Sequence, residues 1–197
     1  MNVLRQAASV AQERCEICAV PIAPEGHGHL VDVANRRLLC ACRACFLLFV
    51  PQGAAQGRYR AVSDRYVRLD PAAFDGPSWE ALQIPIGLAF FFLNGTTHRV
   101  AAFYPGPGGA TESSLSLDAW EAIVRAEAAL TDLQPDVEAV LVYRERTAEP
   151  LAFVVPIDVC YELVGIVRRY WQGFEGGSEL RDRVTRYFER LGERCFA

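Results

Sequence analysis

Polar and apolar residues alternate on both sides of a short turn in the first quarter of the chain. Residues 29–33 and 36–40 carry this alternation, and the Ala-Asn pair between them suits a turn. An apolar run then continues through residues 45–50, which is long enough for one or two helical turns before a proline. The pattern predicts a β-hairpin followed by a short helix.

A second hairpin is predicted in the middle of the chain. Residues 86–93 form an almost continuous apolar run, an Asn-Gly pair suited to a tight turn follows, and residues 98–104 return. Two more strands are expected at residues 137–143 and 151–155, on either side of a charged turn. Two such pairs favour a mostly antiparallel sheet.

Three amphipathic stretches predict helices. The first covers residues 115–130, with Ser116 positioned to cap it. The second covers residues 158–171 and presents apolar residues along one side. The third follows a glycine-rich break, begins at Ser178 and is expected to end at Gly192.

The chain is expected to divide at residues 51–57, whose small residues are typical of a flexible linker. We expect a cysteine-rich metal-binding module at residues 1–52 and an α+β body at residues 58–197. The order of elements in the body predicts a mostly antiparallel sheet with helices on one face. Since 51% of the 197 residues are apolar, the chain can bury a hydrophobic core.

The composition also favours one compartment. The longest apolar runs, at residues 45–51 and 86–93, are too short to span a bilayer. The first residues lack an apolar stretch of signal-peptide length. We therefore expect a soluble, cytoplasmic protein with no membrane insertion, in which reduced cysteines hold metal rather than form disulfides.

All 20 basic residues are arginine, so no lysine is present for Schiff-base chemistry or a Walker-type nucleotide site. Residues 36–68 carry a net charge of +6, whereas the rest of the chain sums to −10. Tyrosines interleave with arginines at residues 58–68, which is compatible with nucleic-acid binding. Because the whole chain is acidic and the basic block is not continued, nucleic acid is a disfavoured partner.

Two C-x2-C pairs, Cys15 with Cys18 and Cys42 with Cys45, are separated by 23 residues. Each pair lets two sulfurs reach one ion from a tight turn, so the spacing predicts a four-thiolate metal site. With a hairpin between the pairs and a helix after them, the layout is treble-clef-like or zinc-ribbon-like. Zinc is the expected ion, and iron in a rubredoxin-like site is the alternative.

Three further donors make the ligand set ambiguous. His29 opens the first predicted strand and Cys40 ends the second, so they are expected to face each other, and His27 lies nearby. Alternation turns Cys40 and Cys42 to the same side, so geometry alone does not choose between them. We favour the four cysteines of the C-x2-C pairs, with Cys40, His29 and His27 as reserve ligands or as groups that support the ligands.

No residue spacing in the body compels catalysis. Glu112 lies in a glycine-rich loop at residues 104–114, and Asp158 is expected to cap its helix. Cys160 lies on the apolar side of that helix, away from His98, so a buried structural thiol is its expected role. An enzyme that uses the Glu112 loop and the Asp158–Cys160 region remains an alternative. The candidate partner or ligand surface comprises Glu112, Arg144, Asp158 and Trp171.

Seven motifs spread over nearly the whole chain carry a family resemblance: Cys15-x2-Cys18, His27-Gly-His29, Arg37 to Cys45, Tyr104 to Ser113, Asp136-Val-Glu138, Pro156 to Gly165, and Trp171 to Gly177. On these motifs the chain resembles an uncharacterised actinobacterial family, a domain of unknown function that is encoded beside NiFe hydrogenase genes. The resemblance implies a gene context rather than an activity, because the family has no established catalytic residues to transfer.

The metal motif and the resemblance combine into one hypothesis. It is a non-enzymatic accessory protein of NiFe hydrogenase that acts in assembly, maturation or tethering through partner binding. The expected partner is the hydrogenase or its maturation machinery. Besides the enzyme above, the alternatives are a rubredoxin-like iron protein that passes electrons to the hydrogenase and a nucleic-acid-binding zinc finger protein.

Overall fold

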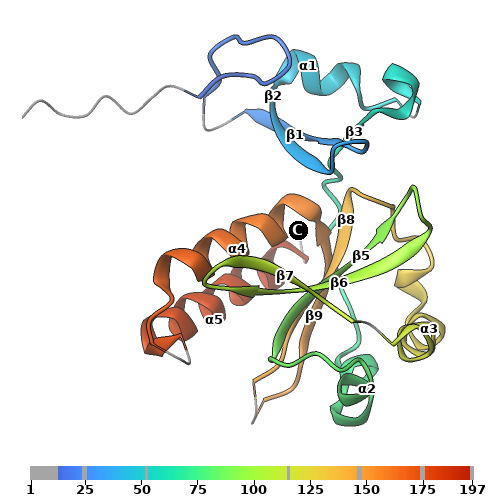
Figure 1. Cartoon of the computed structure of the whole chain (residues 1–197), viewed down its shortest axis with the longest axis vertical. Coiled ribbons are helices and arrows are strands. Elements are labelled where there is room, and N and C mark those ends of the chain that lie inside the picture. The colour runs from blue at the N-terminus through green and yellow to red at the C-terminus, as the bar shows by residue number, and fades with distance from the viewer. Residues whose placement is uncertain are drawn as a thin grey trace, which may run out of the picture. The chain divides into compact units, whose positions relative to one another are not determined.

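The computed structural model describes residues 13–23, 26–51, 53–114, 116–145, 148–173 and 176–195. The chain divides into two compact units, residues 1–61 and 62–197 (Figure 1). The division falls after Ala61, beyond the linker expected at residues 51–57, because residues 59–61 pair with a strand of the first unit. Gln52 of that linker and Leu115, the expected start of a helix, lie outside the described residues.

The first unit contains a three-stranded antiparallel sheet in the order β2-β1-β3. Its strands are β1 (His27–Asp32), β2 (Arg37–Cys42) and β3 (Tyr59–Ala61), and helix α1 (Arg43–Leu48) follows β2 directly. The predicted hairpin and short helix are confirmed. Leu30, Leu39 and Ala41 from the hairpin form the core of this unit with Cys15, Ile22 and Cys45.

The buried carboxylate of Asp32 closes the hairpin turn. It accepts hydrogen bonds from the side-chain amide of Asn35 at 2.9 Å and from the backbone N–H of Asn35 at 3.1 Å. The Asn35 side chain, together with Arg58, holds the pKa of Asp32 below its usual range. The turn is therefore longer than the Ala-Asn pair expected from the sequence, and it begins at the last residue of β1.

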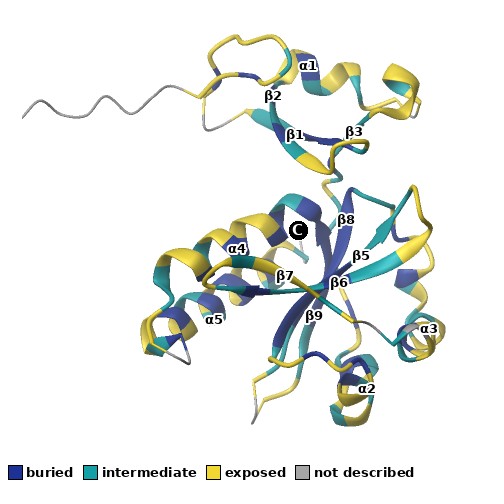
Figure 2. Cartoon of the chain, viewed as in Figure 1, coloured by how far each residue is buried: buried dark blue, intermediate teal, exposed yellow. Residues whose placement is uncertain are grey.

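The second unit contains a six-stranded sheet in the order β4-β9-β8-β5-β6-β7, and every neighbouring pair is antiparallel. The strands are β4 (Val67–Arg68), β5 (Leu88–Asn94), β6 (Arg99–Gly106), β7 (Gly109–Ser113), β8 (Glu138–Tyr143) and β9 (Leu151–Pro156). The predicted α+β class with a mostly antiparallel sheet is confirmed. Figure 2 shows β8 and β9 as almost entirely buried, which places the core at the centre of the sheet.

Strand β7 lies where the sequence predicted a loop. The chain turns back after β6, so that Gly106 pairs with Gly109 and Pro105 pairs with Ala110. Gly109 has a φ of +123°, a conformation that favours glycine. Because β7 is the last strand of the sheet, it needs no apolar alternation, and its residues are small or polar.

Four helices flank this sheet: α2 (Gly76–Ala81), α3 (Leu117–Ala126), α4 (Ile157–Tyr170) and α5 (Gly177–Arg194). Short 3-10 turns occur at Pro71–Phe74 and Ala128–Leu130. Helix α3 is shorter than predicted because Glu127 has an extended backbone. Helix α5 begins after Gly176 and continues to Arg194, so the predicted cap at Ser178 and end at Gly192 are wrong.

None of the helices described is both long and apolar enough to cross a membrane.

Helices cover both faces of the sheet, whereas the sequence predicted one. On one face, Phe91 stacks on Trp120 of α3 with ring centroids 5.0 Å apart, and Trp79 of α2 meets the edge of Phe91. On the other face, Phe153 packs near Phe188 of α5, and α4 crosses β6 to β9. Neighbouring residues of a strand point to opposite faces, so the continuous apolar runs of these strands serve two cores.

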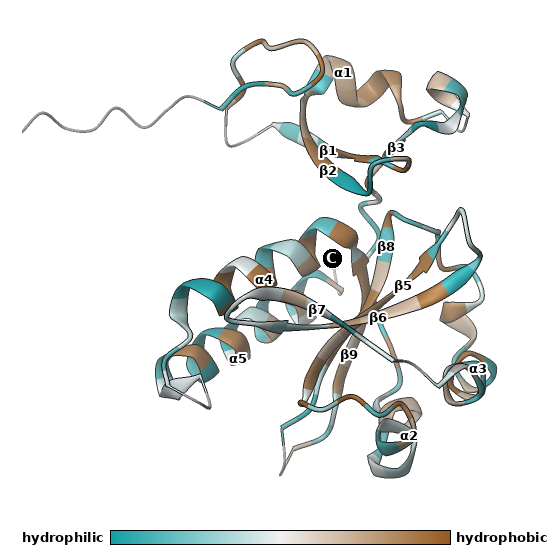
Figure 3. Ribbon diagram, in the orientation of Figure 1, coloured by the Kyte–Doolittle hydropathy of each residue, from teal (hydrophilic) through white to brown (hydrophobic). Residues whose placement is uncertain are grey.

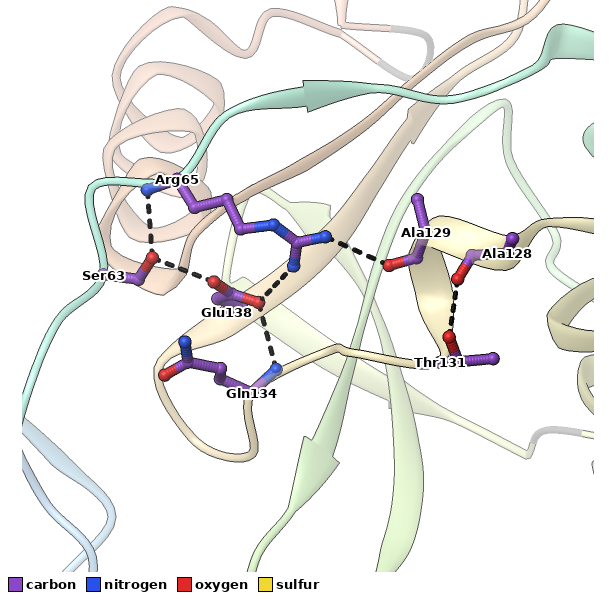
Figure 4. A network of polar contacts seen from close by, with 7 residues as sticks. All are labelled: Ser63, Arg65, Ala128, Ala129, Thr131, Gln134 and Glu138. Atoms are coloured by element: carbon purple, nitrogen blue, oxygen red, sulfur yellow. Dashed lines mark hydrogen bonds and ion pairs between the residues drawn. The ribbon is translucent and has the colours of Figure 1, made fainter. Parts of the chain in front are cut away.

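A buried carboxylate organises the start of the second unit (Figure 4). Glu138 on β8 has no exposed surface and accepts hydrogen bonds from Ser63 Oγ at 2.9 Å and from the N–H of Gln134 at 3.0 Å. The guanidinium of Arg65 lies 2.9 Å from the same carboxylate and also donates to the carbonyl of Ala129 at 3.2 Å. The network joins residues 63–65 to β8 across more than 70 positions of sequence.

Replacing Gly87 with alanine is expected to destabilise the second unit. A Cβ at Gly87 would collide with the backbone carbonyl of Arg144, whose own N–H donates to the Gly87 carbonyl at 2.6 Å. Forcing such a contact costs about 1–3 kcal/mol of unfolding free energy. Urea unfolding of the full chain measures this loss. Gly108→Ala is the control, because a Cβ there meets no heavy atom within 4 Å; equal midpoints for both variants would contradict the expectation.

Candidate metal centre

The first cysteine pair lies in a tight turn. The N–H of Ala19 donates to the carbonyl of Cys15 at 2.8 Å, and the N–H of Cys15 donates to the carbonyl of Val20 at 2.9 Å. Ala19 has a φ of +63°, which reverses the chain, and Arg14 donates to its carbonyl at 3.0 Å. This turn brings the sulfurs of Cys15 and Cys18 together on one side of the loop.

The second cysteine pair lies where β2 becomes α1. Cys42 is the last residue of β2 and the N-cap of α1, and its sulfur accepts the N–H of Cys45 at 3.5 Å. Cys45 is buried in the first turn of the helix. Helix α1 lies close to β1 because Gly28 has no side chain; a Cβ there would collide with the ring of Phe46. Helix α1 is thereby fixed with the sulfurs of Cys42 and Cys45 directed toward the turn that contains Cys15 and Cys18.

The four sulfurs of Cys15, Cys18, Cys42 and Cys45 all lie within 4.8 Å of one another. The sulfurs of Cys18 and Cys42 are 3.7 Å apart. Two ligands of a tetrahedral ion with 2.3 Å metal–sulfur bonds are separated by about 3.8 Å, so this pair already has the required spacing. The four-cysteine cluster could bind a metal ion, and with the hairpin and α1 it could form a zinc-ribbon-like module.

The protonation of the cluster is strongly uneven. Burial alone would raise the pKa of Cys15, but N–H groups of Cys42, Cys18 and Ile17 donate to its sulfur and lower the pKa to about 6. Burial, and then the neighbouring thiols, raise the pKa of Cys45 well above its usual range. The backbone therefore stabilises the Cys15 thiolate, whereas burial and the neighbouring thiols disfavour the charged form of Cys45. A bound cation would supply the positive charge that the buried thiolate of Cys45 needs.

The reserve ligands form a second, neighbouring group. His27, His29 and Cys40 also have ligand atoms within 4.8 Å of one another, and none of them belongs to the four-cysteine cluster. His29 and Cys40 are register partners across the hairpin, as expected. Burial and the carboxylates of Glu16 and Glu13 raise the pKa of Cys40. The sequence left these residues as reserve ligands or as groups that support the ligands, and in the structure their ligand atoms form a group of their own.

The candidate surface residues of the second unit lie on both faces of the sheet. Glu112 is exposed on β7, opposite Phe103, and the guanidinium of Arg144 lies over Trp79 on the face of α2. Asp158 lies in the first turn of α4, on the other face, and Trp171 ends α4 and donates to the carbonyl of Gly173 at 2.8 Å. Arg144 therefore lies on the opposite face of the sheet from Asp158, whereas Glu112, as the register partner of Phe103, lies on the face that α4 crosses.

Helix α4 differs from its prediction at its cap, whereas Cys160 is buried as expected. Its N-cap is Pro156, so Asp158 does not cap it; the Asp158 carboxylate instead accepts the N–H of Val159 at 2.9 Å. Cys160 is completely buried, and burial raises its pKa well above the usual value. A nucleophilic cysteine needs a lowered pKa and access to substrate, so this thiol has the properties of a core residue.

Together, the two units define an α+β protein with an N-terminal module whose cysteines could bind metal. The chain belongs to a family of unknown function, DUF5947, whose family model matches residues 14–195. The match includes both cysteine pairs and nearly all of the second unit. No curated protein and no solved structure matches the chain.

Proposed function

We propose that the chain is a non-enzymatic accessory protein that binds zinc through Cys15, Cys18, Cys42 and Cys45 and acts by binding a protein partner. The closed cluster of four cysteines carries this proposal. Four protein ligands leave no coordination position for a substrate, and such closed sites are typical of structural zinc rather than catalytic zinc. The zinc would hold the first turn, the hairpin and α1 in one rigid unit.

An exposed apolar surface on the first unit supports partner binding. Leu47, Leu48 and Val50, at the end of α1, are exposed by 50%, 67% and 53%. Figure 3 shows α1 as largely hydrophobic, and Figure 2 shows the same helix as mostly exposed beyond its first turn. We call these three residues the α1 apolar patch. Contiguous exposed apolar residues often mark the contact site of a partner.

The family resemblance supports the identity of the partner. It implies a gene context with NiFe hydrogenase, so the proposed partner is a hydrogenase subunit or a maturation factor. The protein would then assist assembly, maturation or tethering in the cytoplasm. Reducing conditions there would keep its cysteines as thiols, and all seven are free in the structure.

Affinity capture from cells that produce NiFe hydrogenase tests this proposal. The tagged wild-type chain is expected to recover hydrogenase subunits or maturation factors, identified by mass spectrometry. Leu48→Asp is expected to reduce their recovery by about tenfold or more, a loss of about 1.4 kcal/mol of binding. Tyr161→Asp is the control, because Tyr161 is exposed to a similar degree but lies on α4.

The metal content of each variant is also measured. This distinguishes a variant that no longer recovers the partner from one that has lost its metal site. Recovery of neither hydrogenase subunits nor maturation factors by the wild-type chain would contradict the proposed partner. Equal loss with both variants would show that the α1 apolar patch has no special part in binding.

Electron transfer by a bound iron is the second candidate function. Four thiolates suit iron as well as zinc, and the exposed side chain of Cys18 would place the ion close to the surface, as electron transfer requires. The visible spectrum of aerobically purified protein separates the two functions. Ferric thiolate is coloured and zinc is not.

A further inference from the structure

We propose that His27, His29 and Cys40 form a second metal site, separate from the four-cysteine cluster. It would take a divalent transition ion of the zinc type and leave one coordination position open. The ligand atoms of all three residues lie within 4.8 Å of one another. The inference goes beyond the proposed partner binding and does not depend on it.

The strand register places these donors together. His27 and His29 are two positions apart on β1, so both side chains point to the same face of the hairpin. Cys40 on β2 is the direct partner of His29. The two imidazole rings meet edge to face, with centroids 5.0 Å apart. Two adjacent strands thus direct two nitrogens and one sulfur to a single point, and no loop has to move to bring these donors together.

The hydrogen bond of His27 prepares it as a ligand. Its Nδ1 lies 3.2 Å from the carbonyl oxygen of Ala23. When Nδ1 donates this bond, the lone pair of the neutral ring is on Nε2, which is then the ligand atom. A metal-binding histidine usually donates its other ring N–H to a carbonyl or carboxylate in this manner, because the bond fixes both tautomer and orientation.

Glu16 fixes the position of Cys40. Its carboxylate accepts the N–H of Cys40 at 2.7 Å, and its own N–H donates to the carbonyl of Cys40 at 2.9 Å. Arg37 lies 3.2 Å from the same carboxylate. The backbone of Cys40 is therefore held from both sides, and the negative charge beside it favours a bound cation.

The donor set determines the class of ion. One thiolate and two imidazoles suit zinc and its neighbours in the first transition row, whereas magnesium and calcium prefer oxygen. All three side chains are only partly buried, so solvent or a small ligand has access to a fourth position. A site with three protein ligands and an open position exchanges its ion and its fourth ligand more readily than a closed four-thiolate site.

Titration of the metal-free full chain with Co²⁺ or Zn²⁺ tests the second site. We expect the wild-type chain to bind about two ions, with the second released first to a weak chelator. His29→Asn and Cys40→Ser are expected to bind about one ion each and to keep the cobalt spectrum of the four-thiolate site. His98→Asn is the control for unspecific histidine binding and is expected to keep both ions, because His98 is exposed in the second unit.

Three results would overturn the proposal. The first is a wild-type chain that binds one ion even in excess metal. The second is a Cys40→Ser variant that loses the four-thiolate spectrum, since Cys40 would then be a ligand of the first ion. The third is a His98→Asn variant whose stoichiometry falls as far as that of His29→Asn.

Discussion

Cys45→Ser is expected to abolish tight metal binding and to unfold residues 13–61 while the second unit stays folded. Among the described residues, the core cluster of the first unit has six buried members, and two of them, Cys15 and Cys45, are candidate ligands. So small a core gives little stability of its own, whereas structural zinc contributes an apparent binding free energy of about 10–16 kcal/mol. Losing one thiolate ligand removes most of this contribution.

Metal quantification and hydrogen exchange of the full chain measure this effect. We expect fast exchange throughout β1, β2 and α1 in Cys45→Ser and in the wild-type chain treated with a strong chelator. Cys195→Ser should change neither property, because Cys195 lies in the second unit, next to the end of α5. Slow exchange in the hairpin of a demonstrably metal-free chain would refute the dependence on an ion.

Arg65→Leu is expected to destabilise the second unit by about 3–5 kcal/mol, because it leaves the carboxylate of Glu138 buried without its charged partner. The side chain of Glu138 has no exposed surface to which water could return, and Arg65 supplies its only ion pair among the described residues. Ser63→Ala removes a neutral donor to the same carboxylate and should cost less, about 1.5–3 kcal/mol.

Chemical unfolding followed by the near-ultraviolet signal of Trp79 and Trp120 reports this unit. The double variant Arg65→Leu with Glu138→Leu should recover much of the loss, since it removes both charges at once. A double variant as unstable as Arg65→Leu alone would show that these side chains stabilise the unit by their packing rather than by their charges.

Local patterns predict the first unit well. The alternation of residues 29–40 and the spacing of the cysteines are sufficient for the hairpin, α1 and a four-cysteine cluster. The separate group of His27, His29 and Cys40 could not be distinguished in this way, because alternation turns Cys40 and Cys42 to the same side. Cys42 is also the N-cap of α1, and its sulfur lies 3.7 Å from that of Cys18, a contact that no spacing in the sequence reports.

The second unit shows what local patterns leave out. The continuous apolar run at Leu88–Phe91 indicates a strand buried on both faces, so helices on both faces were within reach of sequence reasoning. Helix α2 is too short for a periodic signal, and β7 has none because it lies at the edge of the sheet. The Glu138 network depends on partners more than 70 positions away, which no local pattern reports.

The position of β7 gives Glu112 a role that needs no substrate. The outermost strand of an open sheet offers backbone groups to any other extended chain and so invites fibrous association between molecules. An exposed carboxylate on that strand repels the same carboxylate of a second copy and so disfavours pairing of the two edges. Glu112 would thus oppose aggregation between molecules. Loss of its carboxylate would be detected first as turbidity in concentrated solution.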